Sequence, residues 1–346
     1  MIRAPLMPLL LIALADAGAP SAPAHPHVYT REGAAMGTII TFTAWTTDDN
    51  RAAKAFQQAF EDIQHIELMM TDWDRPGVPK SDVVRINEAA GKQPVQVSAE
   101  TLEVIETAQD MSQRSGGAFD ITFAAMRGLW KFDEDLDKKV PPAEEIRKRK
   151  KLINYRDVVV DHKAQTVYLR RPGMRLGLGG IAKGYAVDRA VAVLRKAGLN
   201  DFIVKAGGDL FAAGSKGDTP WRVGIADPRG ARGEYFATAP IKDHAFSTAG
   251  DYERSFVLGG KRYHHIIDPK TGFPATASRS VTIYAPTALA ADALDDAVFI
   301  LGPERGMKLV DSLPGTAAVI VDAHNKVFIS PALQSIVKHH SPTDGV

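Results

Sequence analysis

Residues 177–188 read Gly-Leu-Gly-Gly-Ile-Ala-Lys-Gly-Tyr-Ala-Val-Asp. The glycines leave little side-chain bulk, so the backbone can approach a ligand closely or turn with a positive φ. Apolar residues then recur at helical spacing up to Leu194, and Gly198 follows where a helix C-terminus favours glycine. A glycine-rich turn that opens a helix presents free N–H groups and the positive end of the helix dipole. We therefore expect this turn to hold the pyrophosphate of a nucleotide.

The same stretch matches the dinucleotide fingerprint G-x-G-x-x-[GA], which is a weak signal by itself. A Rossmann fold requires a strand that is buried on both faces before the glycines. The preceding segment, residues 166–171, is half polar, ends at Pro172-Gly173 and lies in the middle of the chain. We therefore predict a mixed α/β protein that is not a Rossmann fold, with one large unit built around a mixed sheet.

The charge and the cysteine content exclude several classes of protein. The 346 residues include 42 basic and 41 acidic side chains, for a net charge of +1. Neither sign is in excess, so a nucleic-acid or anionic-membrane partner is not favoured. Cysteine is absent, which excludes disulfides, cysteine-ligated metals, thiol nucleophiles and a lipid-modified N-terminal cysteine.

The N-terminal 24 residues have the pattern of a secretory signal peptide. Arg3 precedes an apolar run, and small residues follow it. The run is too short to span a bilayer as a helix. We expect export to the periplasm, cleavage between Ala17 and Ala24, and a mature protein that does not span the membrane. Residues 25–35 are interpreted as a spacer and residues 36–335 as one domain.

Acidic residues gather on a helix predicted to begin at Thr287. Asp292 and Asp296 are four residues apart, so both carboxylates leave the same face, and Asp295 lies close by. Such like charges repel one another, and their neighbours in sequence are alanine and valine rather than basic residues. A hard divalent cation with oxygen ligands fits this pattern. An exposed acidic turn of helix is the alternative.

Two further sites carry side chains suited to chemistry. His264 and His265 precede a Pro-x-x-Gly turn that begins with Asp268. Successive strand residues point to opposite faces, so each histidine is a metal ligand, an acid–base group or an ordinary strand residue. Trp73 lies in a polar loop, residues 71–81, where its ring either covers the core or stacks on a base.

Seven motifs occur in the order seen in the ApbE family, the FAD:protein FMN transferases, and the chain resembles that family from Met36 to about Leu301. The motifs are residues 36–38, 115–120, 178–186, 207–209, 247–252, 265–272 and 292–294. The resemblance implies an exported, Mg²⁺-dependent enzyme that splits FAD, esterifies FMN to a threonine hydroxyl of another protein and releases AMP. The implied acceptor is a threonine-containing protein of an exported or membrane redox complex.

The resemblance also implies roles for individual residues. The carbonyl of Gly180, with Asp292 and Asp296, is expected to hold the metal. His265 is expected to border the phosphoryl-transfer centre and is our candidate base, with Asp268 available to orient its ring unless strand alternation sends it to the opposite face. The residues expected around FAD are Met36, Trp73, Ala118, Phe119, Asp120, Gly177, Lys183 and Ile267.

Three residues depart from the family pattern. Gly177 stands where aspartate is usual, Trp73 where tyrosine is usual and Asp296 where threonine or serine is usual. Two other functions therefore stay open. One is a metal-dependent FAD pyrophosphatase that yields FMN and AMP, and the other is a non-catalytic periplasmic flavin carrier.

Overall fold

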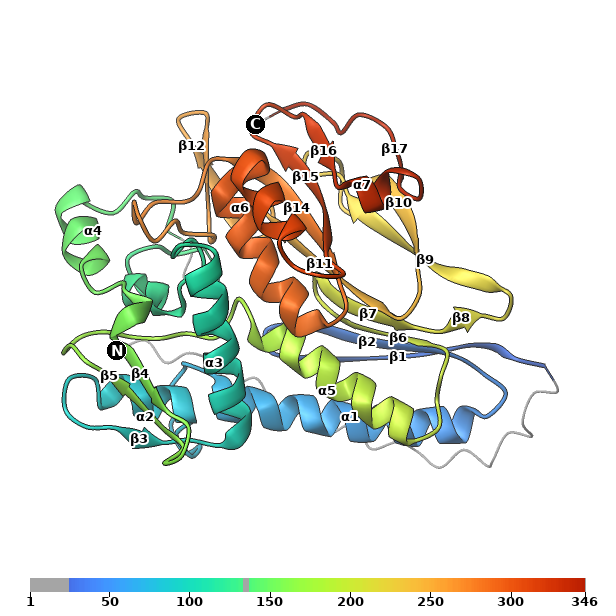
Figure 1. The fold of residues 1–346 in the computed structure, drawn as a ribbon, viewed down its shortest axis with the longest axis horizontal. Helices are drawn as coiled ribbons and strands as arrows, with labels where there is room; N and C mark the ends of the chain where they lie inside the picture. The colour runs from blue at the N-terminus through green and yellow to red at the C-terminus, as the bar shows by residue number, and fades with distance from the viewer. Residues whose placement is uncertain (1–24, 133–136, 346) are drawn as a thin grey trace.

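A computed structural model describes residues 25–132 and 137–345, and the predicted signal peptide lies outside them (Figure 1). Its largest element is an eight-stranded sheet in the order β1–β2–β6–β7–β11–β14–β15–β16. The strands are β1 (His27–Ala35), β2 (Thr38–Thr46), β6 (Phe202–Ala206), β7 (Asp209–Ala213), β11 (His244–Gly250), β14 (Ser278–Ala285), β15 (Ala317–Asp322) and β16 (Val327–Ile329). The mixed α/β class is confirmed. The sheet itself is not mixed, because every neighbouring pair is antiparallel.

Helix α6 (Ala288–Asp311) shows why two strands joined by a helix are antiparallel here. One straight helical pass between neighbouring strands gives a parallel pair. Gly302, with a φ of 72°, and Pro303 break α6 in the middle. A Cβ atom on Gly306 would lie 2.7 Å from the side chain of Val298, so the second half of α6 folds back beside the first. Two passes return the chain antiparallel to β14.

Helices cover one face of the large sheet. Helix α1 (Asp49–Met70) packs on α5 (Ala182–Lys196), α5 packs on α6, and α6 lies on β11, β14 and β15 (Figure 1). Apolar residues at helical spacing, among them Phe56 and Ile63, turn toward the sheet and are buried. The helices predicted after the glycine turn and after Thr287 are confirmed.

A smaller sheet covers the opposite face. Its order is β17–β10–β9–β8. Its strands are β8 (Ser215–Lys216), β9 (Thr219–Ala226), β10 (Tyr235–Ile241) and β17 (Lys338–His339). Alternation along β15 shows the two layers, since Ile320 belongs to the core under the helices while Val319 and Val321 belong to the core between the sheets.

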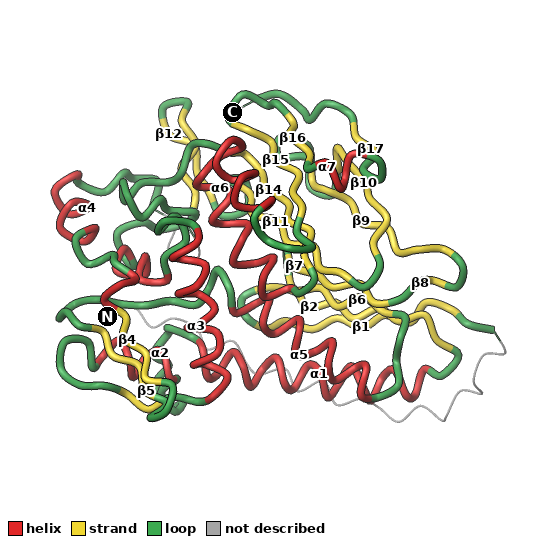
Figure 2. Tube along the Cα trace, viewed as in Figure 1, coloured by secondary structure: helices red, strands yellow, loops and turns green. Residues whose placement is uncertain are grey.

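The remaining elements form a lobe beside the large sheet (Figure 2). A three-stranded antiparallel sheet in this lobe contains β5, the strand that precedes the glycine turn. A Rossmann fold requires the strand before the glycines to lie in a parallel sheet. Because β5 pairs antiparallel with β3 and β4, the glycine turn is not part of a Rossmann fold. The elements are α2 (Asp82–Glu88), β3 (Val95–Gln96), α3 (Ala99–Arg114), α4 (Ala143–Lys150), β4 (Val158–Asp161) and β5 (Thr166–Leu169), followed later in the chain by β12 (Ser255–Leu258) and β13 (Lys261–His264). Helix α7 (Pro331–Gln334) is not part of the lobe and packs against β15, with Leu333 in the core between the sheets.

Both proposed limits of the domain require correction. Residues 27–35, interpreted as spacer, form the edge strand β1, which pairs with β2 along its whole length. Its side chains are mostly polar because the strand lies at the edge of the sheet, so no apolar pattern marked it. At the other end, β17 pairs with β10 beyond residue 335, and the Thr343 N–H donates to Asp227. Among the described residues, no helix has the length and apolar character needed to cross a bilayer.

Candidate active site

The glycine turn leads into α5, and α5 meets α6 at Gly184. A Cβ atom on Gly184 would lie 2.2 Å from the carbonyl oxygen of Ala288, so only glycine allows this approach. The Gly184 N–H donates to Oδ2 of Asp292 over 2.8 Å. An N–H group at the start of the helix, expected to face a phosphate, is therefore bonded to a side chain of the acidic helix.

Asp188 makes a second connection between the two helices. Its carboxylate accepts hydrogen bonds from the N–H groups of Ala288 (2.8 Å) and Leu289 (2.9 Å), the first residues of α6. Burial raises the pKa of Asp188 to about 6, although these two hydrogen bonds oppose the rise. The start of α6 is thus fixed to α5, and the acidic residues of α6 are fixed with it.

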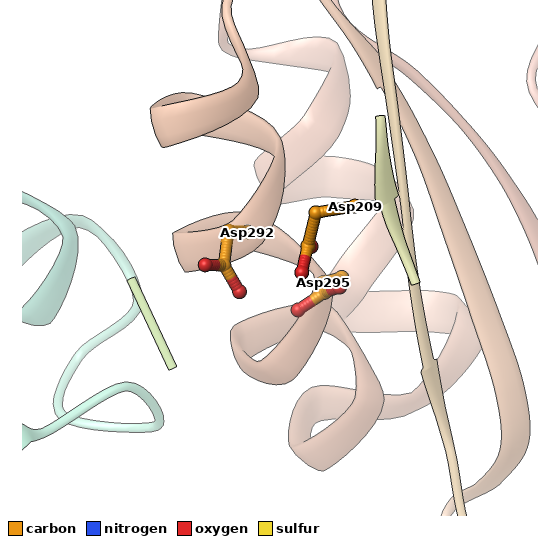
Figure 3. Close-up of side chains that lie close together, drawn as sticks. All are labelled: Asp209, Asp292 and Asp295. Carbon is orange, nitrogen blue, oxygen red and sulfur yellow. The ribbon is translucent and has the colours of Figure 1, made fainter. Parts of the chain in front are cut away.

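Three carboxylates converge between α6 and the first residue of β7 (Figure 3). Asp209, Asp292 and Asp295 each offer an oxygen within 4.8 Å of the others. The ammonium group of Lys183, from the first turn of α5, lies 2.5 Å from Oδ2 of Asp209 and 3.1 Å from Oδ1 of Asp292. The Lys183 side chain thus joins the carboxylates of two different elements.

The hydroxyl of Ser247 on β11 contacts two members of this group. Its Oγ lies within hydrogen-bonding distance of Asp209 and 2.5 Å from Oδ2 of Asp295. A serine hydroxyl has one proton and can donate to only one of them. The other contact requires a protonated carboxyl group, and burial with the charges of Asp296 and Asp292 favours that form of Asp295 by raising its pKa well above the usual value.

The group carries more negative than positive charge. Burial, followed by the charge of Asp209, raises the pKa of Asp292 to about 7. Burial also raises the pKa of Asp296 to about 6. Burial opposes the charged form of Lys183, but Asp209 and Asp292 outweigh it, so the pKa of Lys183 is raised and the group stays protonated. Oxygen donors with excess negative charge suit a hard cation, so these residues fit Mg²⁺.

Asp296 lies against the glycine turn. A Cβ atom on Gly180 would be 2.6 Å from Oδ2 of Asp296 and 3.5 Å from Cε2 of Phe119. The structure therefore brings together Gly180, Asp296 and Phe119, which the sequence placed in one site. Asp292 instead contacts Lys183 and Gly184. The two predicted metal ligands, Asp292 and Asp296, therefore have different immediate neighbours.

His265 directly follows β13, and His264 is the last residue of that strand. The Nδ1 atom of His265 is buried and has no hydrogen-bond partner among the described residues. Burial is the main cause that lowers the pKa of His265 to about 3, and the positive charges of His264, Arg254 and Lys183 contribute in the same direction. The ring is therefore neutral at physiological pH and lies within electrostatic range of Lys183.

Asp268 does not make the orienting contact considered for it. Its Oδ1 accepts a hydrogen bond from the N–H of Lys270 over 2.8 Å, and its carbonyl accepts from Gly272. Asp268 thus stabilises its own turn, as aspartate commonly does at the start of a turn. Ile267 is buried and forms a single β-bridge with Pro274, which carries the chain into this turn.

The residues expected around FAD fall into two groups. Met36 lies in the β1–β2 turn with a φ of 53°, and its N–H donates to Oε2 of Glu67 over 2.9 Å. Trp73 is the more open of the two, with 63% of its surface exposed. These two residues are accessible from solvent, as a ligand contact requires.

Ala118, Phe119 and Asp120 are instead buried. Both oxygens of Asp120 are bonded within the protein, since Oδ1 accepts from Thr122 and Oδ2 accepts from the N–H of Tyr155. Burial raises the pKa of Asp120, and these hydrogen bonds oppose the rise. Asp120 therefore fixes the segment around Phe119 and has no oxygen without a partner.

The space beside Gly177 contains a carboxylate from another segment. A Cβ atom on Gly177 would lie 3.0 Å from the Cβ of Ala124 and 3.6 Å from Oδ2 of Asp72. Gly177 thus supplies no side chain, but Asp72 supplies an acidic group at the same place. No short motif predicts this contact, because more than a hundred residues separate the two positions.

Asp209 and Ser247 also belong to the group around Lys183, although the sequence analysis assigned neither of them to a site. Asp209 ends the Gly-Gly-Asp motif, and Ser247 begins the Ser-Thr-Ala-Gly-Asp-Tyr motif. The position of each within a motif was the available signal. The motifs do not predict that Asp209 and Ser247 lie side by side, because this depends on the pairing of β7 with β11.

Comparison with known proteins agrees with this arrangement. Residues 36–321 match the family model described as the ApbE family. The chain is 32% identical to the FAD:protein FMN transferase of Treponema pallidum (strain Nichols), over 95% of this chain and 94% of that protein.

Solved structures show the same fold. The crystal structure of the ApbE protein of Thermotoga maritima superposes with a TM-score of 0.80 at 34% identity, covering 90% of this chain and 99% of that one. The apo form of the flavinyl transferase ApbE of Pseudomonas stutzeri gives a TM-score of 0.77 at 26% identity, covering 90% and 97%. The chain therefore belongs to the ApbE family.

Proposed function

We propose that this protein is an FAD:protein FMN transferase that uses Mg²⁺, transfers FMN to a threonine hydroxyl of an acceptor protein and releases AMP. One observation carries the proposal, namely the buried group of Asp209, Asp292 and Asp295 around Lys183, beside the glycine turn of an ApbE-family chain. Phosphoryl transfer depends mainly on positioning and on neutralising charge. The site offers both a fixed ammonium group and an excess of oxygen donors.

The metal would be held by Asp292 with the Gly180 carbonyl and Asp296, and the carboxylate of Asp209 would add negative charge nearby. A bound Mg²⁺ supplies positive charge that offsets the charge of a pyrophosphate. Lys183 supplies a second positive charge that is present at every physiological pH, since its pKa is raised. The connections at Gly184 and Asp188 hold α5 and α6 together, so Lys183 and Asp292 are in place before substrate binds.

His265 is the group proposed to take the threonine proton. The threonine oxygen attacks the phosphorus of the FMN half, the bond from that phosphorus to the bridging oxygen breaks, and AMP leaves with that oxygen. Because the ring is neutral, it is able to accept the proton. An anionic pyrophosphate nearby would raise the proton affinity of the ring, as opposite charges do.

Incubation with FAD, Mg²⁺ and a threonine-containing flavoprotein acceptor tests the proposal. We expect one AMP per acceptor that gains FMN in covalent linkage, detected by intact-protein mass spectrometry and nucleotide chromatography. Fast release of free FMN and AMP without acceptor would instead identify an FAD pyrophosphatase. Tight FAD binding with no AMP, even with acceptor, would identify a flavin carrier.

We also propose that the protein acts after export, on an acceptor that belongs to an exported or membrane redox complex. The support is the signal-like pattern of residues 1–24. Fractionation of cells that express the full chain tests this, with the processed protein expected in the periplasmic fraction. Recovery of unprocessed protein in the cytoplasm would contradict it.

A further inference from the structure

The loop between α1 and α2 exposes a tryptophan that is nevertheless held in place. Trp73 is 63% exposed, and the guanidinium carbon of Arg127 lies 3.9 Å from the centre of its ring. A cation at this position is attracted to the face of an indole. Arg127 therefore covers one face of the indole ring. The solvent-exposed surface of Trp73 lies on the ring edges and on the opposite face.

Arg127 is itself fixed. Its Nη1 donates to the carbonyl oxygen of Asp72 over 2.7 Å and forms an ion pair with the Asp72 carboxylate. Its backbone N–H donates to the carbonyl of Ala124, at the end of a short 3-10 helix (Ile121–Met126). A guanidinium group is planar, so anchoring it in two places sets the plane against which the indole stacks.

This arrangement borders the candidate active site. The Asp72 carboxylate reaches to within 3.6 Å of a Cβ position on Gly177, the first residue of the glycine turn. The Gly177 N–H donates to the carbonyl of Ile121 over 2.9 Å. The loop that carries Trp73, the segment that carries Arg127 and the glycine turn are thus in mutual contact.

We propose that Arg127 is a positioning residue that holds Trp73 as a one-sided platform on which the planar ring system of the flavin nucleotide stacks. The inference rests on the proposed function, because it takes FAD as the ligand. Aromatic rings prefer offset stacking, and a ring held in advance loses less side-chain freedom when the ligand binds. Without Arg127, the exposed indole would have to be ordered by the ligand itself.

Titration of FAD into four variants and the wild type tests this inference. Arg127→Met keeps the length of the side chain without its charge or plane, and Arg127→Lys keeps the charge alone. Trp73→Ala and the double variant with Arg127→Met complete a double-mutant cycle. Arg31→Ala is the matched control, because it removes an exposed arginine stacked on Tyr29 at 4.4 Å.

We expect Arg127→Met to weaken FAD binding about three- to tenfold. The same variant should reduce the quenching of flavin fluorescence at saturation and raise KM at nearly constant kcat. Arg127→Lys should weaken FAD binding nearly as much as Arg127→Met, because it keeps the charge but not the plane. Arg31→Ala should bind FAD as the wild type does. In the Trp73→Ala background, Arg127→Met should have no further effect, because there is no ring left to position.

Two results would overturn the inference while leaving the proposed function intact. One is an Arg127→Met variant, folded by circular dichroism, whose FAD affinity and quenching equal those of wild type. The other is an equal loss of affinity from Arg127→Met in the Trp73→Ala background, which would assign the effect to the freed charge of Asp72. Wild-type protein that binds no FAD would instead overturn the proposed function, and this inference with it.

Discussion

The two faces of the eight-stranded sheet are packed in different ways. Between the sheets, apolar side chains such as Trp221 and Phe236 fill the space against Phe246 and Val319. Under the helices, an apolar core also surrounds a group of buried charges centred on Lys183. Burying like charges is unfavourable, whereas burying apolar surface is favourable. The comparison indicates that the sheet–sheet face mainly stabilises the fold and that the helical face gives up stability for chemistry.

Asp292→Asn should produce the largest effect, and it tests the helical face. Asparagine keeps an oxygen for the Gly184 N–H but removes the negative charge. We expect the transfer rate to fall on the order of 10³-fold, since loss of a bound metal removes several kcal/mol of charge stabilisation. The melting temperature should change little, because relief of the repulsion among the carboxylates offsets the loss of the ion pair with Lys183. Full Mg²⁺-dependent turnover in this variant would show that the helical face is not the metal site.

Phe236→Ala tests the opposite face. Phe236 is 1% exposed, and truncating a buried phenylalanine costs about 3–5 kcal/mol of stability. Urea unfolding should show this loss. The transfer rate per folded molecule, measured well below the unfolding midpoint, should stay at the wild-type value. A slower rate in molecules shown to be folded would contradict the separation of the two faces.

His265→Ala sharpens the comparison within the helical side. A positioned base contributes typically ~10²–10⁴-fold in rate, so we expect at least a ~10²-fold slower transfer with FAD affinity unchanged. Single-turnover kinetics at saturating FAD would measure this, with the exposed His324→Ala as control. Weaker FAD binding at an unchanged rate would mean that His265 contacts the substrate and that the base lies elsewhere.

The same histidine predicts a pH dependence of stability. Its pKa falls from 6.5 to about 3 on folding, chiefly through burial, so the unfolded chain binds a proton that the native state does not. Stability from this group is therefore complete above pH 6.5 and is lost as the pH falls toward 3. The free energy of unfolding of wild type, relative to His265→Gln, should decrease between pH 7.5 and pH 5 in urea titrations. A constant difference over that range would show that the ring is already accessible to protons.

Asp296→Thr should have the smallest effect. Asp296 lies against Gly180, and a threonine hydroxyl retains an oxygen there. We expect the rate and the Mg²⁺ affinity to fall by ~10-fold, the lower end of the range typical of partners around a metal site. A loss as large as that of Asp292→Asn would place Asp296 among the indispensable ligands of the metal.

Local patterns in the sequence predicted much of the fold. Thr287 begins a helix where one was expected, because its side chain accepts a hydrogen bond from the N–H of Ala290 in the first turn. The edge strand β1 was missed, since its polar side chains resemble those of a spacer. The antiparallel pairing around α6 was also missed, because a Gly-Pro pair predicts a break but not the direction in which the chain leaves it.

The candidate site was predicted in part. Resemblance to a family placed Gly180, Phe119 and Asp296 in one site, and the structure brings them together. Contacts formed by residues distant in sequence could not be predicted. The Asp72 carboxylate beside Gly177 is one example, and the second carboxylate contact of Lys183, with Asp209, is another. Such contacts depend on how helices and strands pack, which no short motif encodes.

The reversal of α6 at Gly302 has a consequence for how the family can change. The first half of α6 is fixed at its start by Asp188 and at its end by the contact between Gly306 and Val298. Each residue of a helix turns the chain by about 100°. Insertion or deletion of one residue between Leu289 and Asp292 would swing Asp292 and Asp295 away from Lys183, although both side chains would still be present. Evolution can thus exchange residues along this segment far more readily than it can change the segment's length.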